Sequence, residues 1–267
     1  VSACLLLLLL FLIWTAGRAG FASLLATYAA RTTQLAAADA AVRVSPNDPE
    51  NHYIRGAILE AANDLPAAIS EYRQAAALRP DDYVLWLSLA KTTELTGDSP
   101  AAIAAATQAV KLAPYYAQPH WQLGNILVRA GQRDGGLKEL RLAGASNPTL
   151  LPAIIDLAWQ LSGGDAEFVA RAIQPETPDA YKALAQYFKQ RGKTSNAIEM
   201  LRAAGSAAEK ERQQYVSELI EAKRFPDAYH LWSAGQAANS ANIIGAAVSY
   251  RSVSGSAPCA MRPMSSR

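Results

Sequence analysis

Residues 49–150 decide the fold because they contain three consecutive copies of one pattern. Residues 49–82 read PENHYIRGAILEAANDLPAAISEYRQAAALRPDD, residues 83–116 read YVLWLSLAKTTELTGDSPAAIAAATQAVKLAPYY, and residues 117–150 read AQPHWQLGNILVRAGQRDGGLKELRLAGASNPTL. Four prolines recur at one constant interval, the length of a copy: Pro46, Pro80, Pro114 and Pro148. A fixed period of roughly 20–50 residues is typical of stacked repeat arrays. The spacing therefore predicts a solenoid over these residues.

Small side chains recur at three positions of each copy, where they allow two helices to approach closely. They are Gly56, Ala90 and Gly124 at position 8, Ala68, Ala102 and Gly136 at position 20, and Ala75, Ala109 and Ala143 at position 27. Position 4 carries His52, Trp86 and His120. We predict that the small residues pack the helices of each repeat together.

Each copy has the pattern of two helices joined by a short turn. Apolar residues follow three-and-four spacing in both halves of the first copy, over 53–61 and over 68–76. Between the halves, Asp64 and Pro66 form a helix start, and Asp98 and Pro100 repeat it in the second copy. The proline that follows each second helix cannot extend it. Because one hairpin cannot bury its apolar faces alone, neighbouring hairpins must stack.

These positions resemble the tetratricopeptide repeat (TPR) family, in which small residues occupy positions 8, 20 and 27 and proline occupies position 32. The aromatic consensus at position 4 is kept only by Trp86. The resemblance implies an all-α, right-handed superhelical solenoid of antiparallel helix hairpins. It also implies that the first helix of each hairpin lines a concave groove that binds a protein or peptide partner.

The flanking segments extend the array. Residues 1–20 carry no charge before Arg18, and the 17 residues before it would span about 25 Å as a helix. We expect a membrane anchor, with a signal segment and a buried soluble helix as alternatives.

Residues 21–48 fit a degenerate N-terminal repeat, whose first helix is nearly continuous with the membrane segment. We expect a single-pass membrane protein whose array is extracytoplasmic, although Arg18 and Arg31 favour the cytoplasmic side.

After Leu150 the period is interrupted. Pro175 follows Pro148 at less than a full period, so residues 151–177 fit a shortened repeat. Residues 178–235 fit further TPR-like repeats. Residues 236–267 are rich in Ser, Ala, Gly and Asn, and we expect this low-complexity tail to be disordered.

Composition excludes several classes of function. The net charge is +2, and residues 49–150 hold nine Lys or Arg against ten Asp or Glu, so nucleic acid is not an expected partner. Cys4 and Cys259 lie at opposite ends of the chain, and no Cys or His spacing indicates a metal. No phosphate-binding loop or catalytic motif is found, so we expect neither a cofactor nor an enzyme. The histidines, His52, His120 and His230, are interpreted as packing residues.

The resemblance identifies candidate groove residues at positions 2, 5, 9 and 12 of each first helix. The predicted partner-binding residues are Tyr53, Leu87, Lys91, Gln118, Trp121, Asn125 and Trp159. For Trp121 and Trp159, packing between repeats is an equally good interpretation. Family members that grip a C-terminal carboxylate use Lys, Asn and Arg, but the matching positions are Tyr53, Ala57, Ser88, Gln118 and Gln122, so that mode is disfavoured.

Three functions remain open from the sequence. The first is a membrane-anchored scaffold that binds an extended segment of a partner protein. The second is the soluble TPR tail of a larger polytopic enzyme of bacterial polysaccharide assembly, of ligase or polymerase type, because the chain starts with Val. The third is a secreted, carbohydrate-associated protein that lacks a C-terminal domain.

Overall fold

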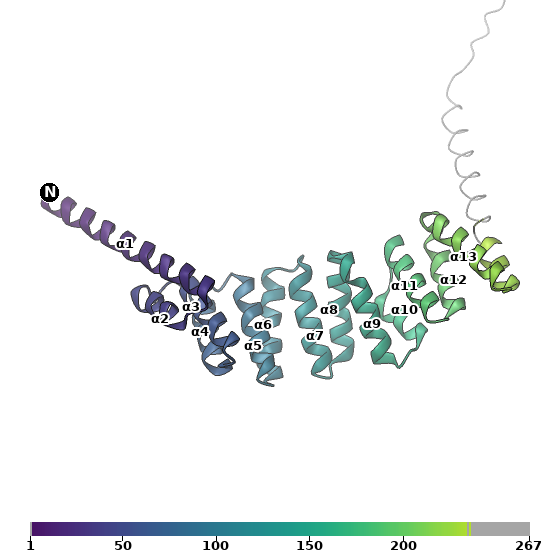
Figure 1. The fold of residues 1–267 in the computed structure, drawn as a ribbon, viewed down its shortest axis with the longest axis horizontal. Coiled ribbons are helices and arrows are strands. Elements are labelled where there is room, and N and C mark those ends of the chain that lie inside the picture. The colour runs from purple at the N-terminus through teal and green to yellow at the C-terminus, as the bar shows by residue number, and fades with distance from the viewer. Residues whose placement is uncertain (1, 234, 236–267) are drawn as a thin grey trace, which may run out of the picture. The chain divides into compact units, whose positions relative to one another are not determined.

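A computed structural model of the chain describes residues 2–233 and 235, and the expected disordered tail, 236–267, lies outside the described residues. The described part is helical and contains no strand, which confirms the all-α class (Figure 1). The chain divides into two compact units, residues 1–150 and 151–267.

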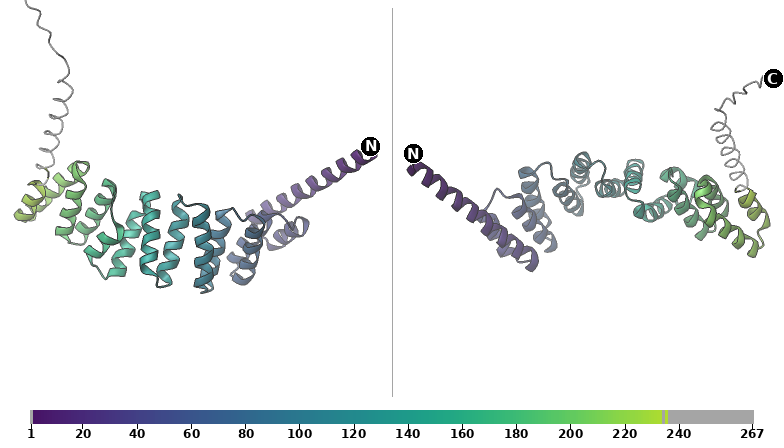
Figure 2. Two further views of the ribbon diagram at one scale, coloured as in Figure 1. Left: turned by 180° about the vertical axis from the view of Figure 1, so that it is seen from behind. Right: turned by 90° about the horizontal axis from the view of Figure 1, so that it is seen from above.

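The first unit consists of consecutive helix hairpins. Its helices are α1 (Ser2–Thr32), α2 (Leu35–Val44), α3 (Pro49–Ala61), α4 (Leu65–Leu78), α5 (Tyr83–Leu95), α6 (Ser99–Leu112), α7 (Ala117–Arg129) and α8 (Arg133–Ser146), followed by the 3-10 helix η1 (Pro148–Leu150). Within each pair α3–α4, α5–α6 and α7–α8 the helices pack together, and α4 contacts α5 as α6 contacts α7 (Figure 2). The prediction of helix, turn and helix in each copy is confirmed.

The turn between the helices of a hairpin depends on position 15 of each copy. That residue has positive φ in all three copies, at 62° for Asn63, 85° for Gly97 and 82° for Gly131. Glycine, and to a lesser degree asparagine, adopts this left-handed conformation at little cost. The next residue then caps the second helix: Asp64 accepts from the Ala67 amide at 3.3 Å and Asp98 from the Ala101 amide at 3.1 Å.

The N-terminal helix is one uninterrupted element. α1 runs from Ser2 to Thr32, so the apolar stretch and the first helix of the expected N-terminal repeat form a single rod. Gly17 and Gly20 do not break it, because neither has positive φ. Ala22, Ala26 and Ala29 are buried, and α1 packs against α2 and α3.

The second unit begins with α9 (Leu151–Ser162). It continues with α10 (Ala166–Ile173), α11 (Pro178–Gln190), α12 (Thr194–Ala203), the 3-10 helix η2 (Gly205–Ala208) and α13 (Glu209–Glu221), and residues 225–233 are again helical. The pairs α9–α10 and α11–α12 are hairpins, and α9 also contacts α11. The second helix of the shortened copy has only 8 residues. Asp165 precedes it, and Gln174, which follows its last residue Ile173, adopts the left-handed conformation.

Candidate functional site: the face of the first helices

The predicted small residues of positions 8 and 20 lie where the two helices of a hairpin touch. Gly56, Gly124, Gly136 and the predicted alanines of positions 8, 20 and 27 are buried. A Cβ atom on Gly124 would lie 3.0 Å from the carbonyl oxygen of Gly136, and one on Gly136 would lie 2.8 Å from the carbonyl oxygen of Gly124. The backbones of α7 and α8 are therefore in direct contact. This contact sets the spacing of the two helices in the third hairpin.

The recurring prolines act through their carbonyl groups. Pro80, Pro114 and Pro148 themselves are exposed. The carbonyl oxygen of Pro80 accepts a hydrogen bond from Trp86 Nε1 at 2.9 Å, and that of Pro114 lies 2.9 Å from His120 Nε2. In the first copy, His52 Nε2 lies 2.8 Å from the carbonyl oxygen of Pro46. The residue at position 4 therefore ties each first helix to the loop before it.

Both histidines of position 4 also pair with a glutamate of the second helix. His52 Nδ1 lies 2.7 Å from Glu71 Oε2, and His120 Nδ1 lies 2.6 Å from Glu139 Oε2. A carbonyl oxygen only accepts hydrogen bonds, so Nε2 carries a proton in each ring. The interpretation of His52 and His120 as structural residues agrees with these contacts.

Ion pairs join neighbouring first helices across their exposed face. Lys91 Nζ of α5 lies 2.8 Å from Glu60 Oε1 of α3, and Arg129 of α7 binds Glu94 of α5 through both carboxylate oxygens, at 2.5 and 2.8 Å. Gln122 Nε2 donates to the backbone carbonyl of Leu87 at 2.7 Å. The charges of this face are thus balanced within the face itself.

Glu60 is the most connected of these groups. Its Oε2 accepts hydrogen bonds from the hydroxyls of Tyr72, at 2.9 Å, and Thr92, at 3.0 Å, while Oε1 faces Lys91. Burial raises the pKa of Glu60, but the hydrogen bonds from Lys91, Tyr72 and Thr92 outweigh burial, and the net pKa lies below its usual range. One carboxylate therefore connects α3, α4 and α5.

This connection predicts a pH dependence of stability. Because the folded state lowers the pKa of Glu60, its contribution is complete above about pH 4.3 and is lost as the pH falls through the folded pKa. Glu60→Gln should lower the free energy of unfolding at neutral pH by about 1 kcal/mol and reduce the further loss on acidification. Urea unfolding at neutral and acidic pH measures both effects. Equal pH profiles for the wild-type chain and Glu60→Gln would contradict the assignment.

The structure places the seven predicted groove residues in different environments. Leu87 is only 3% exposed, so it supports the face from below and offers no side chain to a partner, which corrects its assignment as a groove contact. Tyr53 packs on Tyr72, with ring centroids 5.8 Å apart. Lys91 is exposed but already pairs with Glu60.

Three of the predicted residues lie together on α7. Gln118 is exposed, whereas Trp121 and Asn125 are partly exposed. The amide nitrogen of Asn125 donates to the backbone carbonyl oxygen of Trp121 at 2.8 Å, which holds the Asn125 side chain against the backbone of α7. α7 therefore presents one large apolar side chain between two amides.

Trp159 belongs to the second unit and has its own surroundings there. Its ring meets that of Tyr187 edge-on at 5.7 Å, and the Arg191 guanidinium lies 5.3 Å from the Trp159 centroid and 3.8 Å from that of Tyr187. Tyr187 donates to Asp156 at 2.8 Å, and burial, followed by this hydrogen bond, raises the pKa of Tyr187 to about 12. These contacts involve Trp159 in packing between α9 and α11.

The residues that connect neighbouring repeats were not predicted from the sequence. Glu60, Glu94, Gln122 and Arg129 were not singled out as structural contacts. The spacing of Glu94 and Arg129 could have indicated their ion pair, because Arg129 follows Glu94 by one repeat length plus one residue. In the part of the chain that the structure describes, no three His, Cys, Asp or Glu side chains gather as metal ligands would.

Comparisons with known proteins define the fold. The chain matches no profile of a known protein family, and no curated protein has a matching sequence. Among solved structures, a MamA RS-1 ArsTM double mutant is 17% identical with a TM-score of 0.51, over 62% of this chain and 94% of that one. The MamA crystal structure has 16% identity and a TM-score of 0.43, over 68% and 88%. YrrB, a TPR protein with an unusual peptide-binding site, has 17% identity and a TM-score of 0.43, over 70% and 82%.

The repeat geometry and the first of these similarities agree. The described part of the chain has the TPR-type fold, built from stacked antiparallel helix hairpins.

Proposed function

We propose that this chain is a membrane-anchored scaffold that binds an extended segment of a partner protein on the first-helix face of its repeats. The binding proposal rests on the surface that α7 presents around Trp121. Trp121 is partly exposed between Gln118 and Asn125, while the charged residues nearby, Glu94 and Arg129, satisfy each other. Aromatic side chains beside hydrogen-bonding groups are typical of binding hot spots.

The charge balance of this face indicates the kind of segment that it binds. Lys91 and Arg129 each form an ion pair with a glutamate, so neither cation is available to bind an acidic partner. A segment without net charge, with one apolar side chain to cover Trp121 and backbone groups for the two amides, fits best.

Replacing Trp121 tests the binding face directly. Peptides selected from a random display library on the detergent-solubilised full chain provide the ligand, and fluorescence anisotropy gives its affinity. Trp121→Ala should weaken binding by about tenfold or more and leave the melting temperature nearly unchanged. Tyr115→Ala removes an aromatic ring that is 89% exposed and should bind normally. Failure to select any peptide, or equal loss in both variants, would count against the proposal.

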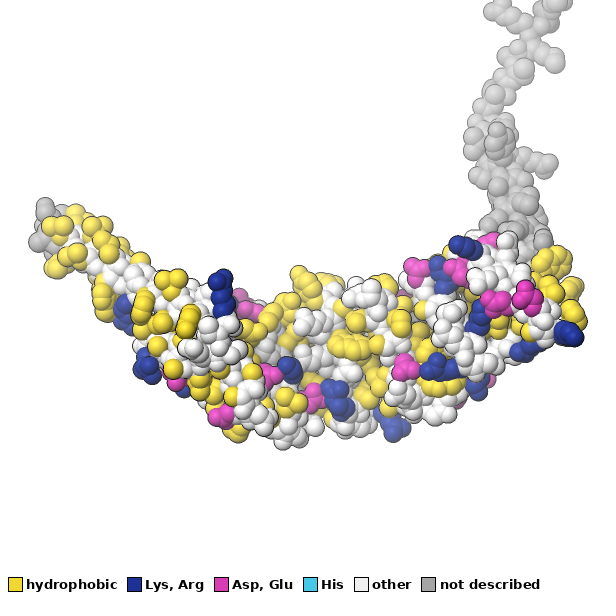
Figure 3. All heavy atoms as spheres, viewed as in Figure 1, with side chains coloured by type: hydrophobic (Ala, Val, Ile, Leu, Met, Phe, Trp, Pro, Cys, Tyr) yellow, Lys and Arg dark blue, Asp and Glu magenta, His cyan; other side chains and the backbone are white. Residues whose placement is uncertain are grey.

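The membrane part of the proposal rests on the exposed surface of α1. Residues Leu5–Thr32 are long and apolar enough to cross a membrane, and only 6% of the apolar 18-residue window within them is buried. Leu5 to Trp14 are each 53–67% exposed, and they cover the start of α1 with hydrophobic surface (Figure 3). Leaving such a surface in water is unfavourable. We place the array on the extracytoplasmic side.

Two charges in α1 should abolish this anchoring. Leu7→Arg with Leu10→Arg should release the chain from carbonate-washed membranes, because each charge in a membrane helix costs about 3 kcal/mol. Leu95→Arg, which replaces a leucine that is 58% exposed on α5, should remain membrane-bound. Sedimentation of both variants measures the effect, and protease protection of a C-terminal tag reports the side. A wild-type chain in the soluble fraction would refute the anchor.

A further inference from the structure

A hollow lies where α1 leaves the repeats. We call it the junction pocket, and its volume is about 260 Å³. It is lined by Thr15, Arg18 and Ala19 of α1 and by Val44, Ser45, Pro46 and Asn47 at the end of α2. This volume is below the roughly 300 Å³ at which pockets for drug-sized ligands begin, so a small polar group suits it better than a cofactor.

Arg18 supplies the charge of the junction pocket. One guanidinium nitrogen donates to the carbonyl oxygen of Val44, and the group lies 4.7 Å from the centroid of the Trp14 ring. These two contacts hold the guanidinium at the pocket and use only part of its five N–H donors. A guanidinium that is fixed in this way is well suited to bind phosphate oxygens in pairs.

The other polar groups of the pocket are neutral and include no carboxylate. Ser45 brings a hydroxyl and Asn47 an amide, whereas the Thr15 hydroxyl already donates to the carbonyl oxygen of Leu12 at 3.0 Å. The loop that carries Ser45 is held in place by Asn51, which is buried and donates to the Ser45 carbonyl at 3.1 Å. Asp48 follows Asn47 but directs its carboxylate to the Glu50 amide at 3.0 Å. The lining therefore favours an anion that accepts several hydrogen bonds.

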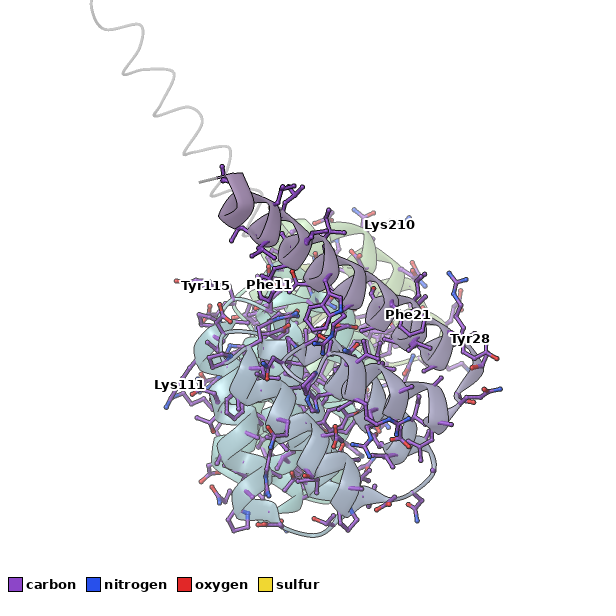
Figure 4. The ribbon with its side chains drawn as sticks, turned by 90° about the vertical axis from the view of Figure 1, so that its left-hand side faces the viewer. Phe11, Phe21, Tyr28, Lys111, Tyr115 and Lys210 are labelled. Atoms are coloured by element: carbon purple, nitrogen blue, oxygen red, sulfur yellow. The ribbon has the colours of Figure 1, made fainter. Side chains whose placement is uncertain are left out.

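The position of the pocket along α1 indicates the source of that anion. The unbroken run of exposed apolar residues ends at Trp14, and Arg18 follows one turn later, about 6 Å along the helix. Beyond Arg18, Phe21, Leu24 and Tyr28 are exposed as well, but this part of α1 packs against α2 and α3. Tryptophan is typical of the interface between acyl chains and headgroups. In a membrane-anchored chain the junction pocket therefore lies at the depth of the lipid phosphates. Along α1, Phe11 lies before the region of Trp14 and Arg18, and Phe21 lies after it (Figure 4).

We propose that the junction pocket binds the phosphate of an anionic phospholipid headgroup, with Arg18 as the main contact. This inference rests on the proposed membrane anchoring of α1. Headgroup binding at the junction would fix the orientation of the first repeats against the bilayer, since Arg18 also binds the end of α2.

Lipid retention by the full chain tests the proposal. The chain is exchanged from bilayers of equal phosphatidylcholine and phosphatidylglycerol into mild detergent, and native mass spectrometry counts the lipids that stay bound. Wild-type protein should retain more phosphatidylglycerol than phosphatidylcholine. Arg18→Gln should lower the ratio of the two retained lipids about tenfold. Arg43→Gln removes an exposed arginine of α2 that does not line the pocket and should behave as wild type. Ser45→Ala should weaken retention to a smaller degree, and circular dichroism verifies that each variant is folded.

The outcomes separate this inference from the proposed function. If the wild-type chain does not sediment with membranes, the anchor itself fails and the lipid site fails with it. If it sediments but retains both lipids equally, or if Arg18→Gln and Arg43→Gln behave alike, only the lipid site is overturned. Displacement of the bound phosphatidylglycerol by millimolar inorganic phosphate would assign the pocket to soluble phosphates and overturn the lipid assignment.

Discussion

Gly136→Ala is expected to destabilise the first unit by about 2 kcal/mol, although alanine is the better helix former. A Cβ atom at this position would lie 2.6 Å from Val128 Cγ2, 2.8 Å from the Gly124 carbonyl oxygen and 3.0 Å from the Val128 backbone nitrogen. Two of these neighbours are backbone atoms, which cannot move without separating α7 from α8. The strain of such overpacking, about 3 kcal/mol, exceeds the gain of about 1 kcal/mol in helix propensity.

The neighbouring glycine provides the control. Gly135 lies in the same helix, but a Cβ atom there would meet only Leu127 Cδ1, at 3.7 Å, an ordinary contact. Gly135→Ala should therefore stabilise the chain by about 1 kcal/mol. Thermal unfolding followed by circular dichroism should show the melting temperature falling by about 4–8 °C for Gly136→Ala and rising for Gly135→Ala. A rise in both variants would show that the two helices do not touch as described.

The sequence predicted this contact because the pattern repeats in register. Positions 8 and 20 are glycine in the third copy and glycine or alanine in the others, and small residues at a fixed period within helices are typical of close helix packing. The same periodicity placed the helices, since Asp64 and Asp98 cap helices that the structure also begins there.

Contacts between side chains were less accessible from the sequence. Leu87 occupies a position that the family assigns to the groove, but it is buried at 3% exposure. Lys91 fits the groove by position, but its charge is already neutralised by Glu60. Whether a side chain at a given position faces a partner or a neighbouring repeat depends on the length and charge of the residues one period away. A consensus position alone does not contain that information.

The hydrogen bonds of position 4 show a relation that was present in the sequence. His52 and Glu71 have the same separation along the chain as His120 and Glu139, and between these copies the same two positions hold Trp86 and Ala105. Histidine therefore occurs with glutamate, and tryptophan occurs with alanine. The structure gives the reason, because an imidazole has a second nitrogen to satisfy whereas an indole has only one N–H.

Glu139→Ala is accordingly expected to lower the free energy of unfolding by about 2–3 kcal/mol, because it leaves a buried polar group without its partner. That group is Nδ1 of His120, a residue that is 5% exposed, and its partner oxygen lies at 2.6 Å. Removing one member of a buried pair lowers the free energy of unfolding by more than the pair contributes to it, since the remaining polar group stays buried without a partner. Urea unfolding of the full chain, followed by circular dichroism, measures this loss.

Adding His120→Trp to Glu139→Ala should recover most of that stability. The double variant reproduces the pair found in the second copy, where Trp86 Nε1 donates to the Pro80 carbonyl oxygen at 2.9 Å and Ala105 lies buried in the core. The new indole has the Pro114 carbonyl as its acceptor, which His120 Nε2 already meets at 2.9 Å. His120→Trp alone should be less stable than the double variant, because Glu139 then faces an apolar ring. If the double variant were no more stable than Glu139→Ala, the two pairs would not be interchangeable, and the role assigned to position 4 would be wrong.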